Sequence, residues 1–338
     1  MSLPSIAQLK SSLSPRQFQL IVLPTEQCNF RCDYCYEDFS IGRMAPQTVA
    51  AVKAFVSRRA RGLDALKIEW FGGEPLAAKD IVLDISQHAQ QVCHENNVVF
   101  SGSATTNGYF LSTSLAAEMA RLGQTRYQIT LDGDKDCHDK TRRLAAGGAT
   151  FERIWANLAA LKDSGLPVSV QLRLHLTNEN FVSMKRLAEK LRDELLGDSR
   201  FSTLIRAVEN LGGPNAASIK PLSHDESARR TREINDILHP GNGTISPPPK
   251  PPLDICYASR PNSIVIRANG KIQKCTVALG SEDNTVGHLD ATGAINLDPR
   301  QMQLWMRGYA NENESELRCP AHHFPYSKRA TIEIKQIP

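Results

Sequence analysis

Between residues 17 and 210, runs of β-branched and apolar residues alternate with amphipathic stretches. The stretch at 150–165, for example, has Phe151, Ile154, Leu158 and Leu161 at helical spacing. Strands that alternate with helices indicate an α/β fold with a parallel sheet. Six such units over roughly 200 residues favour a partial (β/α)6 TIM-like barrel over a complete one, and an open doubly wound sheet is the main alternative. The predicted strands lie within 17–26, 66–75, 97–108, 126–133, 167–177 and 201–210.

Polar or glycine-rich residues follow the first four predicted strands. Cysteines follow the first, Gly-Gly-Glu-Pro (72–75) the second, Thr-Thr-Asn-Gly (105–108) the third and Leu-Asp-Gly (131–133) the fourth. The carboxyl ends of barrel strands meet on one face, where barrel enzymes assemble their active sites. We therefore expect these four segments to converge on one site.

The first of these segments, CNFRCDYCYE at 28–37, holds Cys28, Cys32 and Cys35 with no fourth Cys or His nearby. A structural zinc site ordinarily has four such ligands. Three thiolates can instead hold a 4Fe–4S cluster and leave one iron open to a substrate or cofactor. The sequence shows no secretory signal, so we expect a cytoplasmic protein in which disulfides are rare.

The segment CNFRCDYCYE resembles the C-x3-C-x-aromatic-C signature of the radical S-adenosylmethionine (SAM) superfamily, with Tyr34 at the aromatic position. The resemblance implies that the open iron chelates the amino and carboxylate groups of SAM. It also implies that an electron from the cluster cleaves SAM to methionine and a 5′-deoxyadenosyl radical, which abstracts hydrogen from unactivated carbon. An external electron donor such as flavodoxin or ferredoxin is implied as well.

The other strand-end motifs resemble the same family. The carbonyls of Gly72 and Gly73 are expected to accept from the methionine ammonium, and Glu74 adds a carboxylate. The stretch DKDCHDKTRR (134–143) resembles that of maturase-type members, in which an arginine pairs with the SAM carboxylate; Arg142 and Arg143 are both candidates. The full set that the resemblance assigns to SAM binding is Tyr34, Gly72, Gly73, Glu74, Pro75, Thr106, Asn107, Thr130, Asp132, Arg142 and Arg173, with Asn180 as a further polar residue and His138 in a supporting or surface position.

A segment dense in Pro and Gly follows the barrel at 239–254 and is expected to form an extended linker. It separates an expected barrel domain at 17–238 from an expected smaller module at 255–338. The module contains two β-type runs joined at Asn269-Gly270, which is a strong hairpin signal. It also contains three further cysteines, Cys256, Cys275 and Cys319.

These C-terminal features resemble the SPASM/Twitch module of radical SAM enzymes, which holds auxiliary iron–sulfur clusters. Full SPASM modules carry more cysteines than the three found here, so two readings stay open. In one, Cys256, Cys275 and Cys319 bind an auxiliary cluster that His322, His323 or the substrate completes. In the other, the cluster has been lost and the fold persists as a substrate platform.

The barrel-plus-module arrangement most resembles enzymes that modify peptides or proteins. The leading hypothesis is oxidative modification of a peptide side chain, by cross-linking. There are three enzymatic alternatives: formylglycine formation like that of sulfatase maturases, the reaction of a Twitch-type small-molecule dehydrogenase, and that of a nucleotide-cofactor maturase. The non-enzyme alternative is a metal-binding scaffold. Because the first motif begins at Cys28, we expect the peptide to bind the barrel mouth, the linker or a sheet edge rather than a separate N-terminal domain.

A net charge of +4 does not indicate that the protein binds nucleic acid, and no apolar run indicates that it enters a membrane.

Overall fold

The computed structural model describes residues 6–240 and 255–323. Its strands are β1 (Gln17–Val22), β2 (Phe30–Cys32), β3 (Ala65–Trp70), β4 (Val99–Thr106), β5 (Gln124–Leu131), β6 (Arg142–Leu144), β7 (Ser169–Leu176), β8 (Phe201–Ala207), β9 (Ser263–Ile266), β10 (Lys271–Gln273), β11 (Thr285–Leu289) and β12 (Ile295–Leu297). Its α-helices are α1 (Ile6–Leu13), α2 (Pro46–Ala60), α3 (Lys79–Glu95), α4 (Thr113–Arg121), α5 (Lys135–Thr141), α6 (Phe151–Asp163), α7 (Phe181–Glu194), α8 (His224–Leu238), α9 (Pro299–Ala310) and α10 (Glu314–Arg318). Short 3-10 helices include η1 (Pro75–Ala78), η3 (Tyr257–Ser259) and η5 (Pro320–His323).

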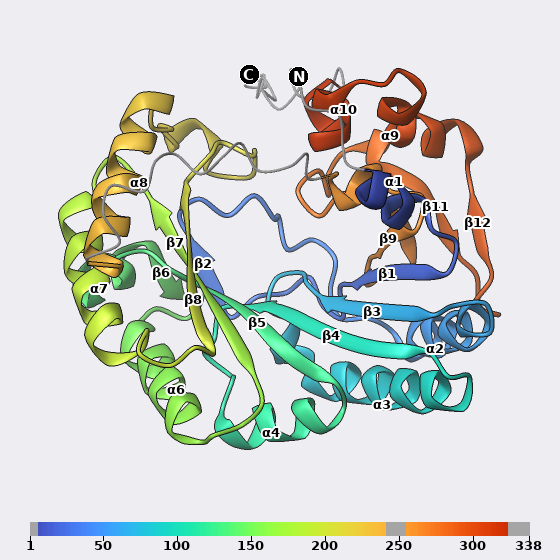
Figure 1. The fold of residues 1–338 in the computed structure, drawn as a ribbon, viewed down its shortest axis with the longest axis horizontal. Helices are drawn as coiled ribbons and strands as arrows, with labels where there is room; N and C mark the ends of the chain where they lie inside the picture. The colour runs from blue at the N-terminus through green and yellow to red at the C-terminus, as the bar shows by residue number, and fades with distance from the viewer. Residues whose placement is uncertain (1–5, 241–254, 324–338) are drawn as a thin grey trace, which may run out of the picture.

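Six parallel strands, β1, β3, β4, β5, β7 and β8, lie side by side in chain order. Helices connect each strand to the next, and α2, α3, α4, α6 and α7 all cover the outer side of the curved sheet (Figure 1). A doubly wound sheet reverses its strand order and carries helices on both faces. The predicted partial barrel with its six strands is therefore confirmed, and the doubly wound alternative is wrong.

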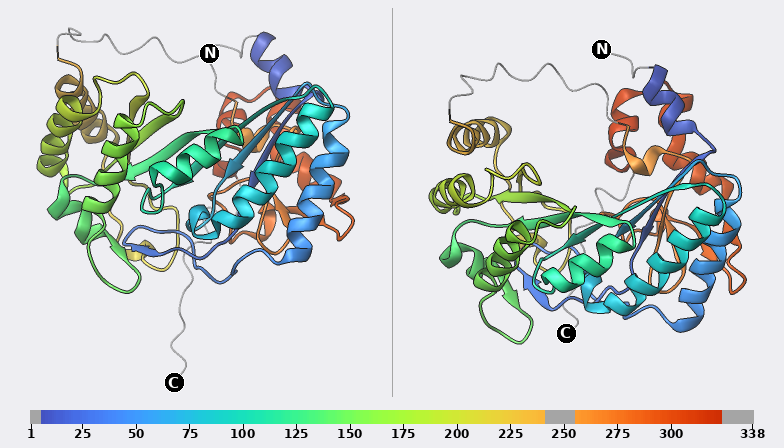
Figure 2. Two further views of the ribbon diagram at one scale, coloured as in Figure 1. Left: turned by 90° about the horizontal axis from the view of Figure 1, so that it is seen from below. Right: turned by 60° about the horizontal axis from the view of Figure 1, so that its bottom comes forward.

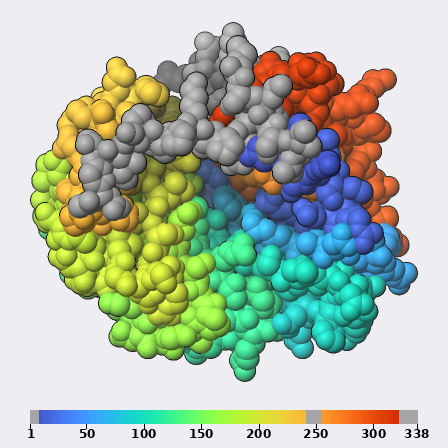
Figure 3. All heavy atoms as spheres, viewed as in Figure 1, coloured from blue at the N-terminus to red at the C-terminus, as the bar shows by residue number. Residues whose placement is uncertain are grey.

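The barrel strands present different residues to their two faces. In β7, Leu172 and Leu174 are buried, whereas Arg173 and His175 are half-buried. The buried positions meet the outer helices, which use apolar faces such as that of α6, where Leu158 is fully buried. The inner face of the incomplete barrel is consequently polar along β7, whereas Ile21, Leu23 and Val265 form a small apolar cluster at β1 and β9. The surface is hollowed between the yellow-green and the blue parts of the chain (Figure 3).

The elements after residue 255 extend the same sheet. Strand β9 pairs in parallel with β1, and β9 and β10 form the predicted hairpin, with Gly270 at a φ of +81° in its turn. Strands β11 and β12 continue the sheet in antiparallel fashion. Helix α1 lies beside the C-terminal elements (Figure 2), and the Asn262 side chain donates to the carbonyl of Ser14 just after this helix at 2.9 Å.

The proposed division of the chain into domains stays a prediction. Residues 241–254 of the predicted linker and residues 324–338 of the predicted module lie outside the described residues. Within the described ranges, no helix has the length and apolar character needed to cross a membrane.

Candidate active site

The three N-terminal cysteines lie on the loop that follows β1. Within this segment, which we call the cysteine loop (residues 28–37), β2 pairs antiparallel with β6 and places Cys32 opposite Arg142. The backbone N–H of Phe30 donates to Cys28 Sγ at 3.3 Å, and that of Cys35 donates to the carbonyl of Cys32 at 3.1 Å. All three thiols are free and half-buried. Pairing with β6 therefore holds the loop in a defined conformation in which its three thiols are free of disulfides.

Burial raises the pKa of the Cys28 and Cys35 thiols to about 12 and also raises the pKa of Cys32. At neutral pH these thiols become thiolates only where the positive charge of a metal compensates them. Three thiols on one loop match the donor set of a cluster with an open iron, in which each cysteine binds a different iron. The described residues contain no group of three Cys, His, Asp or Glu side chains that would hold a single ion.

The glycines of the FGGEP motif lie directly against the chain that leads into the cysteine loop. A Cβ on Gly73 would lie 2.5 Å from the carbonyl oxygen of Gln27, and one on Gly72 would lie 2.4 Å from that of Thr25. Gly72 also has a φ of +107°, which favours glycine. We predicted that the carbonyls of these glycines accept from the methionine ammonium; the structure adds that the glycines let two loops pack together.

This packing leads to a first prediction. Gly73→Ala is expected to displace the cysteine loop and to lower iron loading about tenfold, a typical cost of disturbing the support of metal ligands. Iron and sulfide per chain after anaerobic reconstitution measure the effect. Gly42→Ala is the matched control, because nothing lies within 4 Å of a Cβ at Gly42. Equal loading of the two variants would show that this contact does not position the cysteines.

Glu74 joins the ends of the second and third barrel strands from inside the protein. Its side chain is 0% exposed, and its carboxylate accepts hydrogen bonds from Thr106 Oγ1 at 2.7 Å and from the backbone N–H of Asn107 at 2.7 Å. The Asn107 side chain donates to Asn29 Oδ1 at 2.8 Å, which carries the network into the cysteine loop. Pro75 follows as the first residue of η1. These residues position the loops around the site, and their contact with SAM stays a prediction.

A second buried network joins the cysteine loop to the fourth predicted strand end. Tyr34 donates its hydroxyl to Asp132 Oδ1 at 2.8 Å and accepts from Arg142 Nη1 at 2.7 Å. Thr141 donates its hydroxyl to Asp132 Oδ2 at 2.7 Å. Burial raises the pKa of the Asp132 carboxyl, and the Arg142 guanidinium opposes that rise. The Nε of Arg142 has no hydrogen-bond partner among the described residues, although the residue is only 7% exposed.

The structure separates the two arginines that the sequence left as alternatives. Arg142 points into the site, whereas Arg143 is exposed and pairs with exposed Asp33 at 2.8 Å on the surface. A buried guanidinium with an unused N–H can receive an anionic group, because an unsatisfied buried donor is unfavourable. Arg142 is therefore the better candidate for an anion at this site.

Further polar residues come from β5 and β7. Thr130 is paired in register with Arg173, whose Nε also lacks a partner among the described residues. His175 lies on the same side of β7 as Arg173, with its Nδ1 3.8 Å from Asp132 Oδ1, and burial lowers its pKa well below the usual value. His175 is therefore neutral at pH 7. We did not predict it, although its i, i+2 spacing from Arg173 was a usable signal.

Two other candidates have supporting positions. Asn180 is buried and donates to the carbonyls of Asp132 and His175 at 2.9 and 2.7 Å. His138 is fully buried and its Nδ1 accepts from the backbone N–H of Asp132 at 3.4 Å. The surface alternative for His138 was wrong. Both residues fix the loop that carries Asp132.

The three C-terminal cysteines come from separate segments but gather in space. Cys256 precedes η3, Cys275 follows β10 and Cys319 follows α10. Burial, together with smaller effects of Cys275 and Cys319, raises the pKa of Cys256 to about 11, so the three thiols lie within electrostatic reach of one another. This donor set fits a metal cluster held by three thiolates. The side chains of the predicted fourth ligands, His322 and His323, lie outside the described side chains.

Residues 22–191 match the family model described as the radical SAM superfamily. Among curated proteins, the chain is similar to PqqA peptide cyclase from Streptomyces rochei, with 25% identity over 211 residues that cover 62% of this chain and 54% of that protein. It is also similar to GTP 3′,8-cyclase from Moorella thermoacetica (strain ATCC 39073 / JCM 9320), with 28% identity over 269 residues, 74% of this chain and 78% of that protein. The match thus spans about half the length of the peptide cyclase.

Solved structures with the same fold include anSMEcpe with bound AdoMet and the Kp18Cys peptide, at a TM-score of 0.63 and 15% identity, covering 85% of this chain and 80% of that one. Streptococcus suis SuiB bound to its precursor peptide SuiA aligns at a TM-score of 0.59 and 16% identity, covering 88% and 68% of the two chains. At such identities the likeness establishes the fold. The segment that matches the family model contains the cysteine loop and both buried networks.

Proposed function

Because this chain belongs to the radical SAM superfamily, we propose that it cleaves SAM reductively and uses the 5′-deoxyadenosyl radical to abstract hydrogen from a peptide side chain. The product in this proposal is an oxidatively modified peptide, and specifically a cross-linked one. A 4Fe–4S cluster on Cys28, Cys32 and Cys35 supplies the electron when bound. The electron reaches the protein from an external donor such as flavodoxin or ferredoxin.

The observation that carries the proposal is the convergence of three free thiols and a buried, partly unpaired guanidinium at one barrel mouth. Arg142 has a donor available for the carboxylate of SAM, and charge-assisted bonds of this kind are strong and directional. The carbonyls of Gly72 and Gly73 are available to accept from the ammonium. Thr130 and Asp132 lie at the end of β5, where we place the ribose and sulfonium.

The choice of a peptide as substrate rests on the relatives. PqqA peptide cyclase is named for a peptide, and both solved structures described above contain a bound peptide. The polar inside of the barrel and the outer edge of β8, which has no partner strand among the described residues, can each receive an extended chain. We place the reaction in the cytoplasm, where a reducing environment preserves the free thiols.

The test of this proposal uses the reconstituted full-length protein with SAM, a reductant and any peptide that a short reading frame beside its gene encodes. Mass spectrometry should show the loss of two hydrogens and a new bond between two residues. Conversion of one cysteine or serine to an aldehyde would favour formylglycine formation instead. The similarity to GTP 3′,8-cyclase supports an alternative in which the substrate is a small molecule. This alternative would be favoured if the protein consumed a nucleotide in a SAM-dependent reaction and left every tested peptide unchanged.

We further propose that Cys256, Cys275 and Cys319 hold an auxiliary iron–sulfur cluster, because burial and mutual repulsion make three neighbouring thiolates unfavourable without a metal. Cys256→Ala is expected to reduce the iron content from about 8 to about 4 per chain. Cys137→Ala is the matched control, since Cys137 is a half-buried thiol outside both sets. If the iron content of Cys256→Ala were unchanged, the C-terminal module would hold no cluster, and its role as a substrate platform would be the remaining hypothesis.

A further inference from the structure

A small cavity of about 260 Å³ lies between the cysteine loop and the β9–β10 hairpin. The segment from Tyr36 to Ile41 forms one wall, and Lys271 and Gln273 of β10 form another. Its lining includes Tyr36, the residue that directly follows Cys35, the last cysteine of the loop. The proposed function assigns no role to this cavity.

An ion pair forms one wall of the cavity. Arg267 donates from Nε to Glu26 Oε1 at 3.1 Å and from Nη1 to the carbonyl of Leu279 at 2.7 Å. Both charged residues are more than nine-tenths buried. The charge of Glu26 is thereby balanced by the Arg267 guanidinium.

Two residues that line the cavity carry buried acceptor oxygens with no donor among the described residues. Gln273 is 1% exposed, and its Nε2 donates to the carbonyl of Leu279 at 3.0 Å, which fixes the amide so that Oε1 is the free acceptor. The Oε2 atom of Glu37 is also buried and without a partner among the described residues. Buried oxygens of this kind ordinarily have a donor, from the protein, water or a ligand.

The charge of the cavity also indicates that its occupant is a hydrogen-bond donor, and specifically a cationic one. Its lining contains four carboxyl groups, Glu26, Glu37, Asp38 and Glu282, and two cationic side chains, Arg267 and Lys271. Burial raises the pKa of the Glu37 carboxyl to about 8, so at neutral pH the three ionised carboxylates and the two cations sum to a net charge of about −1. An occupant that carries positive charge and several N–H donors would satisfy both the charge and the free oxygens.

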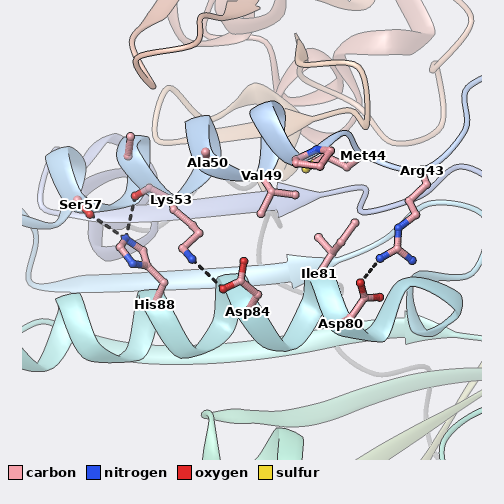
Figure 4. Close-up of a pocket in the computed structure, with 12 residues that line it drawn as sticks. Arg43, Met44, Val49, Ala50, Lys53, Ser57, Asp80, Ile81, Asp84 and His88 are labelled. Atoms are coloured by element: carbon pink, nitrogen blue, oxygen red, sulfur yellow. Dashed lines mark hydrogen bonds and ion pairs between the residues drawn. The ribbon is translucent and has the colours of Figure 1, made fainter.

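A larger cavity elsewhere serves as a contrast. The groove between α2 and α3 measures about 620 Å³, and its charged side chains already pair with one another (Figure 4). Lys53 contacts Asp84 at 2.7 Å, Arg43 pairs with Asp80, and no polar side-chain atom lining this groove is buried without a partner. The volume of a cavity therefore does not by itself indicate a binding site. Buried polar atoms without hydrogen-bond partners, such as those of the smaller cavity, do indicate one.

We propose that the cavity at the cysteine loop binds an organic cation, an alkylammonium or guanidinium group, with Glu37 Oε2 and Gln273 Oε1 as its acceptors. Resting on the proposed function, we assign the cation to a lysine or arginine side chain of the peptide substrate. Such an anchor beside Cys35 would fix the register of the peptide at the reactive end of the barrel. A free diamine is the other source of the same chemistry.

Isothermal titration calorimetry of the reconstituted full-length protein tests this site. The probes are Nα-acetyl-lysine methylamide, Nα-acetyl-arginine methylamide, the neutral Nα-acetyl-norleucine methylamide and putrescine. We expect a cationic amide to bind at least about tenfold more tightly than the norleucine amide, as expected for a charged hydrogen-bonded group. Equal binding of the cationic and neutral amides would overturn the proposal. Tighter binding of putrescine than of either cationic amide would overturn the assignment to a peptide.

Three variants sharpen the test. Glu37→Gln is expected to weaken binding of the cationic amide about tenfold, and Gln273→Glu to strengthen it about fivefold through the added charge. Asp84→Asn removes a carboxylate from the α2–α3 groove and should leave affinity within about twofold. Should Glu37→Gln fail to fold, unchanged affinity in Gln273→Glu still refutes the site.

The same preparations are assayed for SAM cleavage, which separates two kinds of failure. Production of 5′-deoxyadenosine without cation binding refutes the cation site alone. Cation binding without 5′-deoxyadenosine refutes the proposed function and retains the site as a binding pocket.

Discussion

Cys32→Ala should abolish SAM cleavage. Cys32 is the central cysteine of the loop, and its strand is held by pairing with Arg142 on β6, so no other thiol can take its place without breaking that pairing. Because the loss of residues that merely support metal ligands already costs about 10–100-fold, loss of a ligand should reduce 5′-deoxyadenosine formation more than about a hundredfold. The measurement is 5′-deoxyadenosine released per chain with SAM and dithionite.

Cys137→Ala is the control for this variant, because it removes a half-buried thiol from α5 and should retain full SAM cleavage. Iron analysis completes the comparison, since Cys32→Ala should lose the first cluster and keep iron at the C-terminal cysteines. Substantial cleavage by Cys32→Ala would mean that the cysteine loop is not the cluster site.

The second large effect is expected for Arg142→Met. This change removes the guanidinium that lies between Tyr34, Asp132 and Cys32 and leaves Asp132 as a buried carboxylate without its nearby cation. A charge-assisted hydrogen bond to the SAM carboxylate is worth about 1.5–3 kcal/mol, so SAM should bind about tenfold to a hundredfold more weakly. Equilibrium binding of radiolabelled SAM to the reconstituted protein gives the dissociation constant.

Arg143→Met is a close control for that variant. The two arginines are neighbours on β6, but Arg143 is exposed and its partner Asp33 is exposed as well, so the pair contributes little. We expect the affinity of Arg143→Met for SAM to stay within about twofold of the wild type. Equal weakening in both variants would indicate a general electrostatic effect rather than direct pairing by Arg142.

Local patterns in the sequence were sufficient to predict the barrel. Its six strands carry long β-type runs, its helices carry apolar faces, and the turn at Asn269-Gly270 forms a hairpin as expected. The order of the strand-end motifs placed the candidate residues at one mouth, because parallel strands end at the same edge. These features depend on residues that are close in sequence.

Pairings between distant segments could not be predicted in the same way. Strands β2 and β6 have three residues each, too few to show a period, so the choice between Arg142 and Arg143 became clear only from their register. The parallel pairing of β9 with β1 joins segments more than two hundred residues apart and has no local signal. In the same way, the sequence shows that residue 74 is a glutamate, but it does not show that Thr106 and Asn107 donate hydrogen bonds to its carboxylate.

Quantification of 5′-deoxyadenosine from the wild-type protein tests the central claim most directly. The full-length chain is reconstituted anaerobically, its iron and sulfide are measured, and SAM and dithionite are added. We predict that SAM is cleaved to methionine and 5′-deoxyadenosine in equal amounts, and only when both SAM and the reductant are present. A protein that holds its full complement of iron and yet yields no 5′-deoxyadenosine would contradict the account and favour a metal-binding scaffold.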